Sequence, residues 1–246
     1  MAKSRMFPFI TKTWNPVKYC SHNCVYCWAR RYGLDSRPIL HEDRMNPRFS
    51  PNDFVFVCDL GDLFCRGVPW DYVERVAEVI NRFPQTRFLL LTKNPQAYGG
   101  LDLDRPENVW FGVTLESDRN YPGISKAPLQ SERIDALRFL ARSDRNIFVS
   151  VEPVLDFDLT DFLWVFEFLK DEEFGKVRGV AVGYDNYGHR LPEPPIEKTL
   201  AFIRGLKNDG IKVFAKTLRP AWYEKHRQIQ EWITNSPKFT EKSSFV

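Results

Sequence analysis

The stretch Cys20-Ser21-His22-Asn23-Cys24-Val25-Tyr26-Cys27 places three cysteines within eight residues, spaced C-x3-C-x2-C, with an aromatic residue just before the last. A structural zinc ion takes four protein ligands, and an iron–sulfur cluster usually takes four cysteines. Three thiolates are therefore one ligand short of a closed site, which leaves one metal position open for another molecule. The polar residues Ser21, His22 and Asn23 favour metal ligation over burial in a core.

Two other interpretations stay open from the residues alone. In the first, His22 or His41 completes a zinc knuckle, and the chain is a zinc-stabilised nucleic-acid-binding module. In the second, the three cysteines are buried and inert, since free cysteine behaves as a small hydrophobic residue. An iron–sulfur redox or sensing protein, which binds a cluster without cleaving a cofactor, is a further alternative.

The spacing C-x3-C-x-aromatic-C resembles the signature of the radical S-adenosylmethionine superfamily. The resemblance implies that Cys20, Cys24 and Cys27 bind three irons of a [4Fe–4S] cluster, and that S-adenosylmethionine chelates the fourth iron. It implies that one electron from the cluster cleaves this cofactor to a 5′-deoxyadenosyl radical, which abstracts hydrogen from a substrate. It also implies an electron donor such as ferredoxin or flavodoxin. The cofactors carry this chemistry, and the protein positions them.

The composition is that of a packed globular protein. Of the 246 residues, 43% are hydrophobic and 15% aromatic, and the net charge of +3 is too weak to demand nucleic acid. Five cysteines, three of them clustered, do not form a disulfide framework, and we see no signal peptide, so a cytoplasmic location is expected. No apolar run approaches the ~18 residues of a membrane helix, so no membrane partner is expected.

Short apolar runs alternate with segments of helical periodicity along the chain. The predicted strands are residues 7–11, 54–58, 88–91, 109–113, 147–151, 180–182 and 213–215. The predicted helices lie within residues 25–32, 69–83, 134–141, 160–169, 196–206 and 222–233, and residues 35–53 are expected to form a loop. We expect Asp71 and Glu74 to form a capping box and Thr160 to cap its helix.

This alternation predicts an α/β fold with a parallel sheet and outer helices. An open doubly wound sheet and a full or partial (β/α) barrel both fit, because ligands bind at the carboxyl ends of the strands in either. The superfamily resemblance implies a partial (β/α) barrel of about six or seven parallel strands, with the cluster loop after the first strand. We expect this domain over residues 1–220, then a helix and loose tail over 221–246.

Candidate cofactor contacts follow from the resemblance. It implies that Asp59, Gly61 and Asp62, which come after the second strand, hold the methionyl end of S-adenosylmethionine, and that Tyr26 packs beside the cofactor. A carboxylate there accepts charge-assisted hydrogen bonds from an ammonium group. A solvated turn rich in Asp and Gly is the alternative interpretation.

Polar residues also follow the later strands, where the resemblance implies contacts to ribose, adenine or substrate. The residues concerned are Thr114, Glu116, Glu152, Gly183, Tyr184 and Asp185. For the two glutamates, a surface salt bridge or loop cap is the alternative, and for the glycine an ordinary turn.

Three residues are candidates for direct chemistry on the substrate. Lys216, at the end of the last strand, is suited to bind a carboxylate or phosphate, although an ordinary surface lysine fits equally. Some radical enzymes use a thiol to return hydrogen to a product radical, and Cys65 or Cys58 is placed for that role, with plain packing as the alternative.

Several stretches resemble one uncharacterised branch of the superfamily found in phage and prokaryotic genomes. They are Thr13-Trp14-Asn15-Pro16, Asp62-Leu63-Phe64, Leu91-Thr92-Lys93, Phe111-Gly112-Val113 and Ser150-Val151-Glu152-Pro153. The branch usually carries Gly-Gly-Glu-Ser after the sixth strand, where this chain has Gly183-Tyr184-Asp185-Asn186.

The branch implies no substrate, but relatives in the wider superfamily include a lyase that repairs thymine lesions, so nucleic acid is a candidate. Residues 207–246 carry eight Lys or Arg against four Asp or Glu. Aromatic and basic groups interleave there at Trp222, Tyr223, His226, Arg227 and Trp232. Such surfaces stack bases and contact phosphates, although a solvated amphipathic helix has the same pattern.

Overall fold

The computed structural model describes residues 7–32, 37–169 and 176–224, and within them seven parallel strands form one curved sheet. The strands of this sheet lie in the order in which they occur in the chain, so each pairs with the one before it in the sheet. The sheet curls into a partial barrel, which stays open on one side because β1 and β9 stand at the two ends of the described order and do not pair. The strands are β1 (Lys12–Trp14), β4 (Phe54–Val57), β5 (Arg87–Thr92), β6 (Val109–Thr114), β7 (Asn146–Val151), β8 (Lys176–Val182) and β9 (Val213–Ala215).

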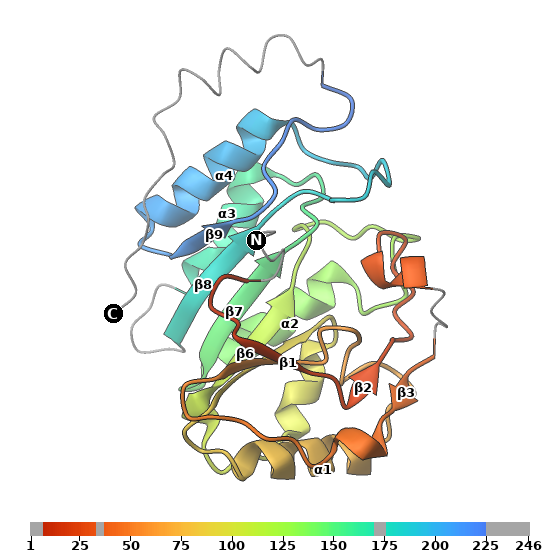
Figure 1. Ribbon diagram of the computed structural model, residues 1–246. Coiled ribbons are helices and arrows are strands. Elements are labelled where there is room, and N and C mark those ends of the chain that lie inside the picture. Colours follow the sequence, from red (N-terminus) through yellow and green to blue (C-terminus); the bar gives the residue numbers. More distant parts are fainter. Residues whose placement is uncertain (1–6, 33–36, 170–175, 225–246) are drawn as a thin grey trace.

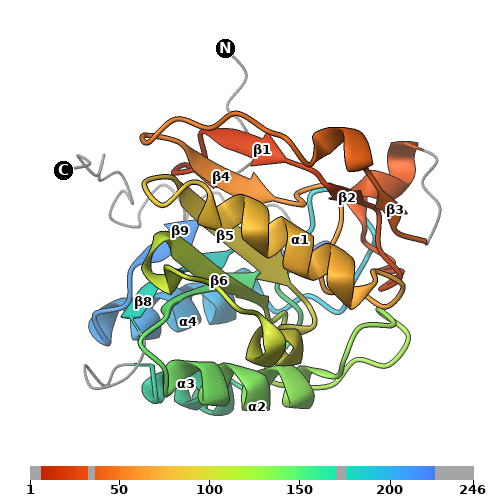
Figure 2. The same cartoon turned by 90° about the horizontal axis from the view of Figure 1, so that it is seen from below.

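In the part of the chain that the structure describes, four α-helices cover the outer face of the sheet (Figures 1 and 2). They are α1 (Trp70–Asn81), α2 (Gln130–Ala141), α3 (Leu159–Glu167) and α4 (Ile196–Asn208). The connection from β5 to β6 carries only two short 3-10 helices, η3 (Pro95–Gly100) and η4 (Pro106–Asn108), so the strict alternation of strand and helix is interrupted there. The predicted α/β partial barrel is confirmed.

The two faces of the sheet are both apolar, which explains the continuous apolar runs of the strands. In β4, Val55 and Val57 face the helices, whereas Phe54 and Phe56 belong to a second cluster on the inner face. Residues alternate between faces with a period of two, so every strand contributes to both layers.

Aromatic side chains fill the inner face of the partial barrel. The ring centroid of Phe9 lies 4.9 Å from that of Trp110 on β6, 5.5 Å from Phe148 on β7 and 5.2 Å from Phe214 on β9. Phe9 therefore packs against strands spread across the whole sheet. The segment before β1 thus closes the interior that an open barrel would otherwise leave to water.

The predicted strand at residues 7–11 is wrong. Pro8 follows Phe7 in a turn that is closed by a hydrogen bond from the Ile10 N–H to the Phe7 carbonyl oxygen at 3.1 Å. Proline favours the second position of such a turn because its φ is fixed near the required value. Phe7 is buried and Phe9 and Ile10 are half-buried in this turn, which packs on the inner face of the sheet, and β1 begins only at Lys12.

Several other local predictions also need correction. Helix α1 begins at Trp70 without a side-chain cap, so Asp71 lies inside the first turn and forms no capping box. Helix α3 is capped by Asp158, whose carboxylate accepts from the Thr160 and Asp161 N–H groups, rather than by Thr160.

The region around the cysteines differs from the prediction in two places. The segment predicted as a helix from residue 25 is a short 3-10 helix, η1 (Trp28–Tyr32). The predicted loop 35–53 contains η2 (Glu42–Arg44) and the strand β3 (Ile39–Leu40), which pairs with β2 (Val17–Lys18) in a small antiparallel sheet. Most of the predicted helix 222–233 lies outside the described residues, and no described helix is long and apolar enough to cross a membrane.

The inner aromatic cluster generates a stability prediction. Phe148 is fully buried, and truncating a buried phenylalanine to alanine typically costs about 3–5 kcal/mol because a cavity remains. We therefore expect Phe148→Ala to lower the free energy of unfolding by about that amount in a denaturant titration. Phe139→Ala, at a side chain that is 72% exposed on α2, is the matched control and should change it by less than about 0.5 kcal/mol. Equal losses in the two variants would contradict a core at this position.

Candidate functional site

The carboxyl ends of the strands and the cysteine loop, defined as residues 19–27, enclose a cavity of about 640 Å³. A cavity of this size is typical of sites for small molecules and cofactors. The predicted site residues that line it are Cys20, Cys24, Tyr26, Cys27, Asp59, Gly61, Asp62, Thr114, Glu152, Tyr184, Asp185 and Lys216. The position at the carboxyl ends of parallel strands is the usual one for ligands in α/β folds.

Three predicted residues are not among the described residues that line the cavity. Glu116 is only 1% exposed and lies behind Tyr26, and Gly183 stands between Glu152 and Lys216. Cys65 is buried, and this burial raises the pKa of its thiol to about 11. Of the two thiols considered for hydrogen return, Cys58 is the one that lines the cavity.

The three cysteines of the loop all line the cavity. Within the described part of the chain, no three His, Cys, Asp or Glu side chains are grouped as they would be around one ion. Each cysteine of a cluster binds a separate iron, so its sulfurs stand further apart than the ligands of one ion. Burial raises the pKa of the Cys20 and Cys24 thiols, so ligation must displace their protons. Three thiols on one cavity fit the donor set of such a cluster.

The first half of the cysteine loop is anchored by Asp62. The Nε2 atom of His22, which lies between Cys20 and Cys24, contacts an Asp62 carboxylate oxygen at 2.8 Å. The same carboxylate accepts from the Thr92 hydroxyl at 2.8 Å and from the Lys93 N–H at 3.0 Å. With both oxygens in use inside the protein, Asp62 holds the loop, and little of its acceptor capacity remains for a ligand.

The second half of the loop is anchored by Glu116. The Tyr26 hydroxyl, between Cys24 and Cys27, donates to this carboxylate, and the Lys93 ammonium lies 3.2 Å from it. Gln130 and Arg133 of α2 each donate to the other carboxylate oxygen at 2.6 Å. Although burial acts in the opposite direction, the charges of Lys93 and Arg133 hold the pKa of Glu116 well below its usual range. Glu116 is therefore an ionised carboxylate surrounded by protein donors.

Backbone contacts complete the support of the cysteine loop. The Lys126 N–H donates to the His22 carbonyl oxygen at 2.6 Å, and the Val25 N–H donates to that of Ile124 at 2.9 Å. Tyr19 and Asn23 adopt positive φ angles of 64° and 49°, which non-glycine residues rarely do. Such conformations persist where the surroundings impose them, and they concentrate at functional sites.

Asp59 and Gly61 form the wall next to the cysteine loop. The Asn15 side-chain amide donates to the Asp59 carboxylate at 2.5 Å, and its oxygen accepts from the Leu60 N–H at 2.9 Å. Burial raises the pKa of Asp59, which keeps acceptor capacity toward the cavity. A Cβ atom at Gly61 would lie 2.7 Å from the Tyr19 carbonyl oxygen, so only glycine lets the loop approach this closely.

The opposite wall carries Glu152 after β7, Gly183 after β8 and Lys216 after β9, in neighbouring register. A Cβ atom at Gly183 would stand 3.0 Å from a Glu152 carboxylate oxygen and 2.9 Å from the Lys216 Cβ, so glycine is needed between them. Burial raises the pKa of Glu152 and lowers that of Lys216, while each charge partly opposes this effect on the other. This wall therefore presents a cation and a carboxyl group to the cavity.

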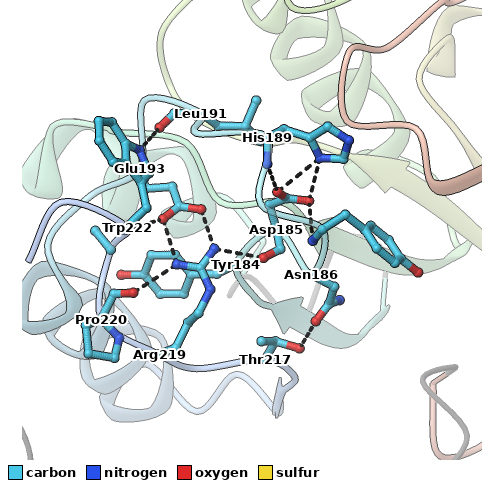
Figure 3. Close-up of polar contacts among 12 residues, drawn as sticks. Tyr184, Asp185, Asn186, His189, Leu191, Glu193, Thr217, Arg219, Pro220 and Trp222 are labelled. Atoms are coloured by element: carbon cyan, nitrogen blue, oxygen red, sulfur yellow. Dashed lines mark hydrogen bonds and ion pairs between the residues drawn. The ribbon is translucent and has the colours of Figure 1, made fainter. Parts of the chain in front are cut away.

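The segment after β8 forms the rim beside this wall (Figure 3). The Asp185 carboxylate accepts from the Tyr187 and His189 N–H groups at 3.1 and 2.7 Å and contacts the His189 Nδ1 atom at 3.0 Å. Arg219 donates to the Asp185 carbonyl oxygen at 2.7 Å and binds the Glu193 carboxylate through two hydrogen bonds of 2.6 and 2.8 Å. The segment after β9 thus fixes the rim.

Sequence reasoning missed the residues that hold the site in place, among them Arg133, Glu193 and Arg219. Arg133 is buried four residues before Leu137, on the apolar side of α2. A charged residue on the apolar face of this helix was the available sequence signal for a buried ion pair. Glu193 lies in a segment without periodicity, so its pairing with Arg219 had no comparable signal.

Solved structures of spore photoproduct lyase share the fold. One, with bound AdoMet and dinucleoside spore photoproduct, has a TM-score of 0.60 and 11% identity over 89% of this chain and 81% of that one. A variant of the same lyase has a TM-score of 0.58 and 12% identity over 83% and 75% of the two chains. At these identities the likeness concerns the fold. A search of curated proteins finds no match.

A family profile described as "Protein of unknown function (DUF5131)" matches residues 5–168, more than half of the 246 residues. The matched segment contains the cysteine loop and both of its carboxylate anchors, Asp62 and Glu116. The chain therefore belongs to the DUF5131 family.

Proposed function

We propose that this protein is a radical S-adenosylmethionine enzyme in which Cys20, Cys24 and Cys27 hold a [4Fe–4S] cluster. The observation that carries the proposal is that all three cysteines open onto one cavity at the carboxyl ends of a parallel partial barrel. When bound, the cluster and S-adenosylmethionine supply one-electron reductive cleavage of the cofactor and a 5′-deoxyadenosyl radical for hydrogen abstraction. The fold shared with a lyase that binds AdoMet supports this reading.

The chain's own residues bind and orient the cofactor. Asp59 accepts hydrogen bonds from the methionyl ammonium group, and Gly61 lets the cysteine loop approach this wall closely. Tyr26 packs beside the cofactor, while Thr114 and Glu152 contact ribose or substrate. Of the acids assigned to the cofactor from sequence, Asp62 and Glu116 are engaged with protein donors, so Asp59 takes the methionyl role.

Part of the cavity lining is apolar. Phe7 lines it from the apolar interior of the barrel, and the Lys216 ammonium lies 4.8 Å from the centroid of the Phe7 ring. An apolar floor below polar walls lowers the local dielectric constant and strengthens the contacts of Asp59, Glu152 and Lys216.

We propose a nucleic acid as substrate. The lyase that shares the fold is described with a bound dinucleoside spore photoproduct. Here Trp28 and Tyr187 line the cavity and offer aromatic surfaces for stacking, and Lys216 is suited to a phosphate or carboxylate. If a thiol returns hydrogen to the product, Cys58 is the better candidate than Cys65, because it lines the cavity. A ferredoxin or flavodoxin would supply the electron.

In the zinc-binding alternative the fourth ligand would be His22 or His41. The Nε2 atom of His22 contacts Asp62 and the Nδ1 atom of His41 lies 3.4 Å from Asp43, so ligation would use the other ring nitrogen. The metal content of the purified protein distinguishes this alternative. A redox or sensing protein shares the cluster and differs in leaving S-adenosylmethionine intact, so cofactor cleavage distinguishes it.

Cofactor cleavage is the first test. Anaerobically reconstituted protein, reduced with dithionite and given S-adenosylmethionine, is expected to form 5′-deoxyadenosine, measured by chromatography. Cys24→Ala should abolish the product because it removes one of three iron ligands, whereas Cys65→Ala should retain it. An intact, reduced cluster that leaves the cofactor uncleaved would favour the redox or sensing protein. Zinc in place of iron in protein purified without reconstitution would favour the nucleic-acid-binding module.

A second test concerns Asp59. Asp59→Asn removes the negative charge that binds the methionyl ammonium, and hydrogen bonds to charged groups contribute about 1.5–3 kcal/mol. We expect the affinity for S-adenosylmethionine to fall at least about tenfold, measured by equilibrium dialysis on the reconstituted protein. Asp71→Asn, at an exposed position of α1, is the control. Unchanged binding in Asp59→Asn would remove this residue from the cofactor site.

A further inference from the structure

We infer that Glu116 and Arg133 are positioning residues that set the place of Tyr26 and so of the segment from Cys24 to Cys27. This inference rests on the proposed function, because it concerns the loop that would bind the cluster. From the sequence, Glu116 was expected to contact ribose or substrate. We infer instead that it holds the cysteine loop in place, and we call the contacts among Tyr26, Glu116 and Arg133 the latch.

The acceptor capacity of Glu116 is already filled. One carboxylate oxygen receives the Tyr26 hydroxyl and the Lys93 ammonium, and the other receives Gln130 and Arg133. A carboxylate offers about four acceptor positions, so no position remains for a ribose hydroxyl. Since Glu116 is also only 1% exposed, a ligand in the cavity would have to displace Tyr26 to reach it.

Arg133 fixes the position of this carboxylate relative to the sheet. Its side chain is 3% exposed, and one guanidinium nitrogen bonds both Glu116, at 2.6 Å, and the Thr114 carbonyl oxygen, at 3.1 Å. Its Nε atom donates to the Pro128 carbonyl oxygen at 2.8 Å. A planar guanidinium group held at three points has little conformational freedom. Arg133 therefore fixes Glu116 relative to β6 and α2. Tyr26 is therefore placed by the rigid part of the fold.

The hydroxyl of Tyr26 has a role that its ring cannot perform. An aromatic ring at this position packs beside a cofactor whether or not it carries a hydroxyl group. In this chain the Tyr26 hydroxyl donates a hydrogen bond to Glu116. Because Tyr26 lies between two cysteines, restraining its hydroxyl restrains the sulfur atoms on either side.

The charges around Glu116 also suit a cysteine loop that has bound iron. Lys93 and Arg133 carry two positive charges against the single negative charge of Glu116. Cysteine binds iron as a thiolate, so a loaded loop brings negative charge into the same region. Lys93 lines the cavity together with the three cysteines, so one positive charge is left to offset the thiolates.

Tyr26→Phe is the sharpest test, because it removes the latch bond and keeps the ring. Residues that orient metal ligands typically contribute 10- to 100-fold to metal affinity. After identical anaerobic reconstitution, we expect Tyr26→Phe and Glu116→Gln to lose iron to a chelator about tenfold faster than the unmodified protein, while Arg133→Lys retains part of the stability. Tyr98→Phe, which removes a buried hydroxyl bonded to the Leu90 and Gly112 carbonyls, is the matched control.

Hydrogen exchange on the iron-free protein separates this inference from the proposed function. Without the latch, the backbone amides of Val25 and Cys27 should exchange about tenfold faster, with the rest of the sheet unchanged. This readout holds even if the unmodified protein takes up no iron, a result that would overturn the proposed function alone. Unchanged exchange and iron retention in Tyr26→Phe, or a loss confined to S-adenosylmethionine affinity, would overturn the latch.

Discussion

A buried carboxylate must be surrounded by hydrogen-bond donors. This chain has two such carboxylates, Asp62 and Glu116, and both lie beside the cysteine loop. Asp62 is 4% exposed and Glu116 is 1% exposed. Each contacts a residue that lies between two cysteines in the sequence, His22 for Asp62 and Tyr26 for Glu116. A hydrogen bond to a charged group contributes about 1.5–3 kcal/mol, so conformations that release His22 or Tyr26 are disfavoured. The cysteine loop has no glycine and no regular structure, and these two contacts together with its backbone bonds define its shape.

The sheet supplies the reference points for both contacts. Asp62 follows β4, and Glu116 follows β6, with β5 paired between them. Thr92 and Lys93, at the end of β5, touch Asp62 and Glu116 respectively, so the middle strand links the two anchors. Parallel strands in fixed register hold their carboxyl ends at fixed separations, and an inner face packed with aromatic rings stiffens them further. The loop is thus irregular in conformation but rigid in position.

The sequence predicts the strands well because their apolar runs are buried on both faces, and this signal is local. The α/β class follows from it, whereas the partial barrel was expected from the superfamily resemblance. The same signal gives a wrong prediction at residues 7–11, because an apolar turn packed inside a barrel has the same sequence pattern as a buried strand. The anchors could not be found in this way. His22 and Asp62 are 40 residues apart, and Tyr26 and Glu116 are 90 apart, so their pairing depends on the completed sheet.

The two walls of the cavity are stabilised by separate sets of interactions. The wall with the cysteine loop depends on Asp62 and Glu116, both within the family-matched residues 5–168. The opposite rim depends on the Glu193–Arg219 pair, and Arg219 reaches the Asp185 carbonyl oxygen from the segment after β9, beyond that match. A change at Arg219 would therefore move the rim through its own partners, while the donors of Asp62 and Glu116 stay in place. This separation allows the shape of the far wall to change without altering the geometry of the cysteine loop.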